Sequence, residues 1–274
     1  MNTWGATAHN IAVGVPERPI LQGVSASVAY GELVALVGSN GAGKSTLLRT
    51  LSGEIRSSSG TVALHGRDLR AWPSAELARR RVMLSQHSNL AFDLPVRQVV
   101  RLGRAPWENT MRAVGHAARV DECLDRVGLL SFAERRYQTL SGGEKQRVQL
   151  ARVLAQMPMT GESPALVLAD EPGSAQDPGY SRAMMAILRD LASDGHAVMV
   201  AMHDLVAAAR VATRVVVMHR GQVVAQGTPQ AALTPETLRH VFGIDAEWVE
   251  VTRNQETHSL LLIHEREATF AVAP

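Results

Sequence analysis

One glycine-rich loop constrains this chain more than any other part of the sequence. An apolar run at residues 33–37 precedes the loop, and residues 47–49 continue after it as a helix would. A strand, a loop and a helix in that order form the context in which the pattern G-x-x-x-x-G-K-[ST] predicts a phosphate-binding loop. The loop consists of Gly38, Ser39, Asn40, Gly41, Ala42, Gly43, Lys44, Ser45 and Thr46.

The residue types of this loop suit a bound triphosphate. Glycines allow backbone N–H groups to converge on an anion, and the start of a helix adds N–H groups and a positive dipole end. Lys44 would reach the β- and γ-phosphates, and the Ser45 hydroxyl would be a ligand of Mg²⁺. The chain has 28 Lys+Arg residues but lysine only at 44 and 145, so its basic composition does not explain this lysine. Taken alone, the motif leaves a glycine-rich turn with a chance lysine as the alternative.

Length and composition bound the possible classes of protein. A chain of 274 residues forms one large domain or two small ones, and 46% hydrophobic residues are enough for a buried core. A net charge of +2 is too small to indicate nucleic-acid binding. Cys123 is the single cysteine, so no internal disulfide is possible and a reducing compartment is expected. Residues 1–10 do not resemble a signal peptide, and no apolar run approaches the ~20 residues of a membrane span.

Hydrophobic patterns predict an α/β architecture. Strands are expected at 21–28, 61–64, 81–84, 165–169, 197–202 and 215–218. Helices are expected at 141–156, 181–192, 205–211 and 235–242, and residues 87–139 form an arginine-rich helical insert. Apolar strands that alternate with helices favour a parallel sheet. At the end of the chain, 248–252 and 260–264 are expected to pair as a hairpin about residues 254–255.

A second motif is the acidic pair Asp170-Glu171 at the end of an expected buried strand. Side chains alternate along a strand, so the two carboxylates are expected to point to opposite sides. One can support Mg²⁺ while the other faces the γ-phosphate and holds a water molecule. A charged pair that simply closes a strand is the alternative, and the upstream loop argues against it.

The third motif is Ser141-Gly142-Gly143-Glu144. Ser141 and Glu144 fit a capping box, so simple helix initiation is the alternative. A capping box does not need the two glycines, which lower helix propensity. They are explained if an anion must approach the backbone closely at this helix start.

These ordered motifs resemble those of ABC transporter ATPases, over about residues 10–243. The resemblance identifies Ser141-Gly142-Gly143 as the signature motif, Gln86 as the Q-loop sensor of γ-phosphate and Mg²⁺, Asp177 as the D-loop aspartate and His203 as the switch histidine. It implies a P-loop NTPase fold with a mostly parallel sheet, an N-terminal antiparallel part and an inserted helical subdomain at about 87–140. The expected division is an ATPase domain at 1–243 and a short extension at 244–274.

The resemblance also implies ligands and partners. ATP and Mg²⁺ are the expected cofactors. Two chains are expected to form a two-fold homodimer in which the signature motif of one closes over nucleotide bound by the other. Two transmembrane permease subunits and a periplasmic solute-binding protein complete the expected complex, at the cytoplasmic face of the inner membrane and without nucleic acid.

A narrower resemblance is to the ATPase subunits of importers for haem, iron-siderophores and cobalamin. It is carried by residues 85–88, 101–106, 203–205 with 207–208, and 233–236. Residues 157–164 are similar to an insert of haemin-import subunits, so haemin is the expected solute. Iron-siderophore or cobalamin import, a non-transport ABC ATPase and a P-loop kinase are the alternatives.

Two departures from the family pattern bear on function. The family places an aromatic residue against adenine, but Val13 and Val15 occupy the corresponding positions, and Trp4 and Tyr30 are misplaced for this role. Weak discrimination between ATP and GTP is therefore predicted. In the D-loop, Gln176 stands where the family has leucine, which affects how this loop packs across the dimer.

Overall fold

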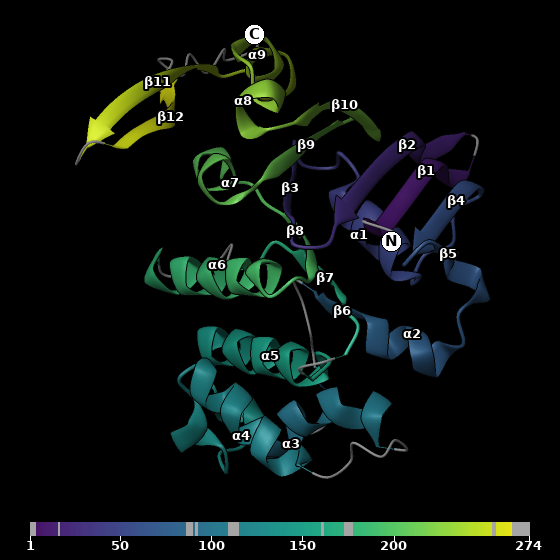
Figure 1. The fold of residues 1–274 in the computed structure, drawn as a ribbon, viewed down its shortest axis with the longest axis vertical. Helices are drawn as coiled ribbons and strands as arrows, with labels where there is room; N and C mark the ends of the chain where they lie inside the picture. The colour runs from purple at the N-terminus through teal and green to yellow at the C-terminus, as the bar shows by residue number, and fades with distance from the viewer. Residues whose placement is uncertain are drawn as a thin grey trace, which may run out of the picture.

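The computed structural model describes residues 4–15, 17–85, 90, 93–108, 115–159, 162–172, 178–253 and 256–264 (Figure 1). A central sheet has the strand order β10-β9-β3-β8-β7-β6. Its strands are β3 (Leu33–Gly38), β6 (Arg81–Leu84), β7 (Leu166–Asp170), β8 (Ala197–Ala201), β9 (Arg214–His219) and β10 (Gln222–Gly227). All neighbours pair in parallel except β9 and β10, so the predicted mostly parallel sheet is confirmed.

An antiparallel sheet packs beside the central one at the N-terminal part of the chain. Its order is β2-β1-β4-β5, with β1 (Trp4–Val15), β2 (Arg18–Ala29), β4 (Ser59–Leu64) and β5 (Arg67–Asp68). The short η1 (Leu69–Ala71) and α2 (Ser74–Arg80) then lead into β6. β1 was not predicted as one strand, because register shifts interrupt its pairing and Asn10 has a positive φ of 49°. β10 was not predicted either, since it is an edge strand without a continuous apolar run.

Two hydrophobic clusters fill the two faces of the central sheet. Alternate residues of β3 belong to different clusters: Leu33, Ala35 and Val37 to one, and Val34 and Leu36 to the other. The second cluster includes buried residues of α1 (Lys44–Ser52) and the antiparallel sheet. Every residue of β3, β7 and β8 is buried, as expected for strands covered on both faces.

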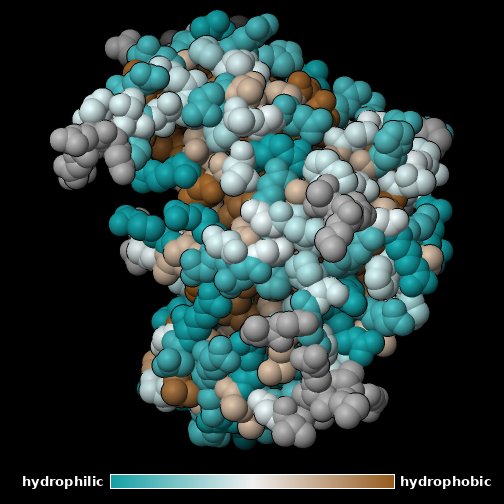
Figure 2. Space-filling view, in the orientation of Figure 1, coloured by the Kyte–Doolittle hydropathy of each residue, from teal (hydrophilic) through white to brown (hydrophobic). Residues whose placement is uncertain are grey.

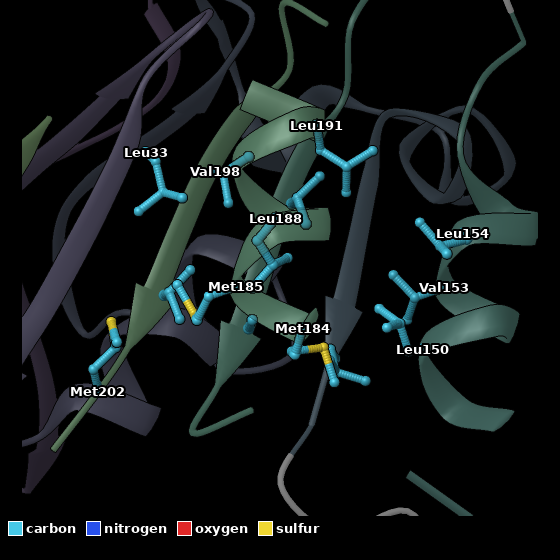
Figure 3. Packing of buried hydrophobic residues seen from close by; sticks show 14 of the residues in the cluster. Leu33, Leu150, Val153, Leu154, Met184, Met185, Leu188, Leu191, Val198 and Met202 are labelled. Atoms are coloured by element: carbon cyan, nitrogen blue, oxygen red, sulfur yellow. The ribbon is translucent and has the colours of Figure 1, made fainter. Parts of the chain in front are cut away.

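The first cluster joins the sheet to α5 (Gly142–Gln156) and α6 (Pro178–Ser193). Figure 3 shows apolar side chains of these two helices pointing toward the strands. Those from α5 are Leu150, Val153 and Leu154, and those from α6 are Met184, Met185, Leu188 and Leu191. On the face seen in Figure 2, hydrophobic side chains lie mainly in recesses between elements whose outer surfaces are hydrophilic.

The predicted insert is helical in its described part. It contains α3 (Val96–Arg101), η2 (Leu102–Trp107), α4 (His116–Arg126), η3 (Leu130–Phe132) and η4 (Tyr137–Thr139). Of these, α3, η2 and α4 pack against α5 in the lower part of Figure 1. The domain boundaries at 87–140 and 243 stay predictions.

The end of the described chain forms the predicted hairpin, with strands longer than expected. After α7 (Leu205–Val211), α8 (Pro229–Ala232) and α9 (Pro235–Phe242), β11 (Asp245–Arg253) pairs antiparallel with β12 (Glu256–His264). Ala246 and Leu261 are buried in the main core, and the Trp248 indole N–H donates to the Leu233 carbonyl at 2.9 Å. The base of the hairpin is thus fixed to the core. No helix among the described residues is long and apolar enough to cross a membrane.

Candidate active site

The phosphate-binding loop connects β3 to α1 as the motif predicts. Gly43 precedes the helix with φ 97° and no side chain caps the helix start. The first N–H groups of a helix have no intrahelical partner, so this end suits an anion. At Gly38, a Cβ atom would lie 2.3 Å from the Met218 carbonyl oxygen, so only glycine lets β3 end beside β9 at this spacing.

Two segments that are distant in the sequence support the phosphate loop, and the sequence analysis did not predict either contact. The Gly221 N–H donates to the Ala42 carbonyl at 3.1 Å, and the Gln22 N–H donates to the Gly221 carbonyl at 2.9 Å. A Cβ at Gly43 would lie 2.7 Å from a methyl group of Leu21. The β9–β10 turn therefore holds the loop by a backbone hydrogen bond, and β2 in turn holds that turn while its Leu21 side chain packs against Gly43. The only sequence signal was the glycine at the Arg220-Gly221 turn, where both residues have positive φ.

Lys44 is folded back over its own loop. Its ammonium donates to the Gly38 carbonyl at 2.8 Å and to the Ser39 carbonyl at 3.4 Å, and the residue is 5% exposed. Burial lowers the pKa of Lys44, while Glu171 and Asp170 act in the opposite direction. The ammonium is thus held beside the loop at the acidic end of β7.

Asp170 is the last residue of β7 and is 4% exposed. Its carboxylate accepts a hydrogen bond from the Ser45 hydroxyl at 2.9 Å, which joins the helix start to the strand end. Burial raises the pKa of Asp170, and the Ser45 hydrogen bond partly opposes that. A hydroxyl and a carboxylate oxygen are ligand types that Mg²⁺ accepts, so this pair fits the metal that the motif implies.

Glu171 lies just beyond β7 and not on it. Its φ of 50° is left-handed, a conformation that is rare for a residue of this size and costs about 1–3 kcal/mol. The Glu171 N–H donates to the Ala201 carbonyl of β8 at 3.1 Å, which holds this conformation. Strand alternation therefore does not extend to Glu171, because β7 ends at Asp170. The two carboxylates have different partners: that of Asp170 accepts from Ser45, and that of Glu171 contacts His203.

The Glu171 carboxylate contacts the imidazole Nε2 of His203. His203 follows β8, and Asp204 caps the start of α7 by accepting from the Ala207 N–H at 2.9 Å. The structure thus brings together the predicted loop, both carboxylates and the histidine at the carboxyl ends of β3, β7 and β8. A cavity of about 560 Å³ borders Glu171 and His203.

Ser141 occupies the N-cap of α5 and forms the predicted capping box. Its N–H donates to the Glu144 carboxylate at 2.7 Å, and the Glu144 N–H donates to its hydroxyl at 3.3 Å. A Cβ added at Gly142 would have no atom of another described segment within 4 Å, so the backbone here is open to an approaching group. The Ser141 carbonyl also accepts from the Lys145 N–H at 2.9 Å, and within the described part of the chain no hydrogen bond joins Ser141 to the phosphate loop. Gln86, Gln176 and Asp177 lie outside the described residues.

The residues considered for adenine stacking lie at opposite ends of the β1–β2 hairpin. Val15 pairs with Arg18 beside the phosphate-loop end and is 58% exposed, whereas Trp4 pairs with Ala29 at the far end. The Tyr30 hydroxyl is hydrogen-bonded to His65. The two aromatic residues are thus on the wrong end of the hairpin for a base above the loop.

Comparison with known proteins identifies the family. The ABC transporter family model matches residues 21–174. The chain belongs to the ABC transporter family. It is 44% identical over 243 residues to the Hemin import ATP-binding protein HmuV of Rhodococcus jostii, with 89% of this chain and 81% of the relative covered. The protein of the same name from Bradyrhizobium diazoefficiens is 46% identical over 242 residues, covering 87% and 88%.

A solved structure supports the same assignment. The dimeric structure of MJ0796, a bacterial ABC transporter cassette, matches with a TM-score of 0.71 and 28% identity, covering 82% of this chain and 99% of that one. The predicted P-loop NTPase fold of an ABC ATPase is therefore confirmed. The glycine-rich loop at residues 38–46 lies within the segment that the family model matches.

Proposed function

We propose that this ABC protein is the ATP-hydrolysing subunit of an importer and that it drives the uptake of haemin. The convergence of Lys44, Asp170, Glu171 and His203 at one edge of the central sheet is the observation that carries ATP hydrolysis. The names of the relatives support haemin as the solute. Iron-siderophore or cobalamin import is the nearest alternative.

The site residues divide the chemistry among them. The loop N–H groups and Lys44 bind the phosphates, and Ser45 with Asp170 holds Mg²⁺, which neutralises phosphate charge when bound. Glu171 is the general base that polarises the attacking water, because its carboxylate follows Asp170 at the strand end beside Ser45 and contacts His203. His203 and Gln86 respond to the γ-phosphate, and Gln86 also contributes to the metal site.

The assembly follows from the open signature motif. Ser141, Gly142, Gly143 and Asp177 act on nucleotide held by a second copy of the chain, in a two-fold homodimer. The openness at Gly142 and the dimeric structure of a related cassette support this arrangement. ABC importer ATPases work with transmembrane permeases, so two permease subunits and a periplasmic binding protein complete the complex on the cytoplasmic face of the inner membrane. ATPase function resides in residues 1–243, with 87–140 as the helical subdomain.

The decisive experiment measures ATP hydrolysis by the complete complex in lipid vesicles. The binding protein is added empty or loaded with haemin, a ferric siderophore or cobalamin. We expect haemin to stimulate hydrolysis, and the complex containing Glu171→Gln to show no hydrolysis with any solute. Stimulation by another solute alone would overturn the assignment of haemin as the transported solute. Hydrolysis that responds to nucleic acid and to no solute would overturn transport altogether.

A further inference from the structure

The carboxyl end of α5 is held by side chains from the helical insert. The carbonyls of residues 154–157 lie where a helix runs out of internal donors. Each accepts a hydrogen bond from an insert side chain: Leu154 from Arg119 at 3.4 Å, Ala155 from Arg104 at 2.8 Å, Gln156 from Trp107 at 3.0 Å and Met157 from Arg104 at 3.3 Å. We call these donors, with Gly103, the α5 clamp.

Arg104 is the centre of the clamp. It is fully buried, at 0% exposure, and its Nε and Nη2 atoms have no hydrogen-bond partner among the described residues. Its guanidinium lies 5.0 Å from the centre of the Trp107 ring. The negative end of the α5 dipole takes the place of a carboxylate partner, and α5 has no basic residue of its own in its last turn. Burial lowers the pKa of Arg104, and the Glu162 carboxylate acts against that shift.

Gly103 permits the close approach that the clamp needs. A Cβ at this position would lie 2.2 Å from the Arg152 carbonyl oxygen and 3.2 Å from the Ala155 Cβ. The motif at residues 101–106, which carried only a resemblance in the sequence, therefore has a structural cause. Gly103 lets η2 pack directly on the α5 backbone, and Arg104, the next residue, reaches the carboxyl end of that helix.

The same helix end is tied to the core. The Gln156 amide donates to the Ala78 carbonyl of α2 at 2.7 Å and to the Arg81 carbonyl of β6 at 3.2 Å. The insert, the core and α5 thus meet at one junction. The other end of α5 begins at Ser141, about 22 Å away along a 15-residue helix.

We propose that Arg104 is a positioning residue that, through α5, sets the orientation of Ser141 toward nucleotide on the second copy. When the insert moves, the clamp makes α5 rotate with it as a rigid helix. The reason is that side chains from η2 and α4 are hydrogen-bonded to the α5 backbone. This inference rests on the proposed homodimer, in which Ser141 completes the partner's site. It predicts that the clamp affects dimer closure and leaves ATP binding by one chain unchanged.

The test uses the full chain carrying Glu171→Gln, so that ATP is bound and not consumed. Dimerisation is followed by analytical ultracentrifugation over a range of ATP concentrations, and ATP binding is titrated at protein concentrations where the chain is monomeric. Arg104→Met should raise the ATP concentration for half-maximal dimerisation by at least about fivefold, the lower end of typical coupling between sites. Arg104→Lys should restore dimerisation in part, since lysine keeps the charge but lacks the planar set of N–H donors of the guanidinium. Monomer affinity for ATP should change less than about twofold, because the clamp and the phosphate loop share no contact.

Two further variants distinguish loss of the clamp from a general loss of stability. Trp107→Phe keeps the ring beside Arg104 and removes one N–H donor, so it should fold and shift dimerisation in the same direction. Leu129→Ala creates a buried defect in the insert without touching the α5 carbonyls, and serves as the control for lost stability. An equal shift with Leu129→Ala, or no shift with Trp107→Phe and Arg104→Lys, would overturn the clamp. If the Glu171→Gln parent itself stays monomeric with ATP, the proposed function is wrong, which is a separate result.

Discussion

Replacing Lys44 with methionine tests the phosphate site with little change in shape. Methionine keeps the length of the side chain and removes its charge. Lys145 is the other lysine of the chain, and its ammonium lies 5.8 Å from the centre of the Tyr137 ring. Lys145→Met is therefore a matched control that makes the same chemical change away from the loop.

The size of the effect follows from the contacts of the ammonium. A hydrogen bond to a charged group contributes about 1.5–3 kcal/mol, and 1.4 kcal/mol corresponds to a tenfold change in affinity. Losing one bond between Lys44 and a phosphate should thus weaken ATP binding by about 10- to 150-fold. The free protein should change little, because the lost bonds to the Gly38 and Ser39 carbonyls are offset by no longer burying an ammonium. We expect the melting temperature to change by less than about 4 °C.

The assay is calorimetric titration of the monomeric chain with ATP, combined with thermal unfolding. Lys44→Met should lose affinity by the stated factor at an almost unchanged melting temperature, and Lys145→Met should bind as the parent does. The reasoning is refuted if Lys44→Met binds within about twofold of the parent, or if Lys145→Met loses as much affinity. A large fall in melting temperature for Lys44→Met would show that the loop itself needs the ammonium.

Four further substitutions test the rest of the site. Glu171→Gln should lower hydrolysis by at least about 100-fold and trap an ATP-bound dimer, and normal turnover would exclude it as the general base. Burial raises the pKa of Asp170, so its ionised form destabilises the metal-free protein at neutral pH and this cost disappears as the pH falls through the raised pKa. Asp170→Asn should therefore melt higher than the parent at pH 7.5, with the difference shrinking toward pH 4; a difference independent of pH would contradict this. Gly38→Ala should destabilise the fold by about 1–3 kcal/mol in urea unfolding, because its Cβ would lie 2.3 Å from the Met218 carbonyl oxygen. An unchanged midpoint of unfolding would show that the end of β3 can shift to accept the methyl group. Val15→Tyr should favour ATP over GTP in hydrolysis, whereas the parent should use both at similar rates, and strict ATP dependence of the parent would reject that.

The sequence predicted best those elements whose ends carry local signals. The bounds of α5 match because Ser141 and Glu144 form a capping box. Those of α9 match because Thr234 caps its start, Pro235 follows and Gly243 ends it with φ 68°. Such signals depend on neighbouring residues only, so they can be read without knowing the fold.

Features that depend on distant contacts were not predictable. β1 runs for 12 residues because it pairs on both sides, with β2 and β4, through bulges that break its alternation. The left-handed φ of Glu171 is held by the Ala201 carbonyl of another strand. The support of the phosphate loop by Gly221 is likewise a contact between segments far apart in the chain. No local pattern contains this information.

The strand order explains why site residues that are far apart in the chain lie together. β8 lies between β3 and β7 in the sheet although it follows both in the chain. Because parallel strands end at the same edge, residues just after these three strands must converge. His203, after the middle strand, is thereby placed in contact with Glu171 after its neighbour, and Ser45 after the loop reaches Asp170. A change in strand order would leave every motif intact and separate the groups that the chemistry needs together.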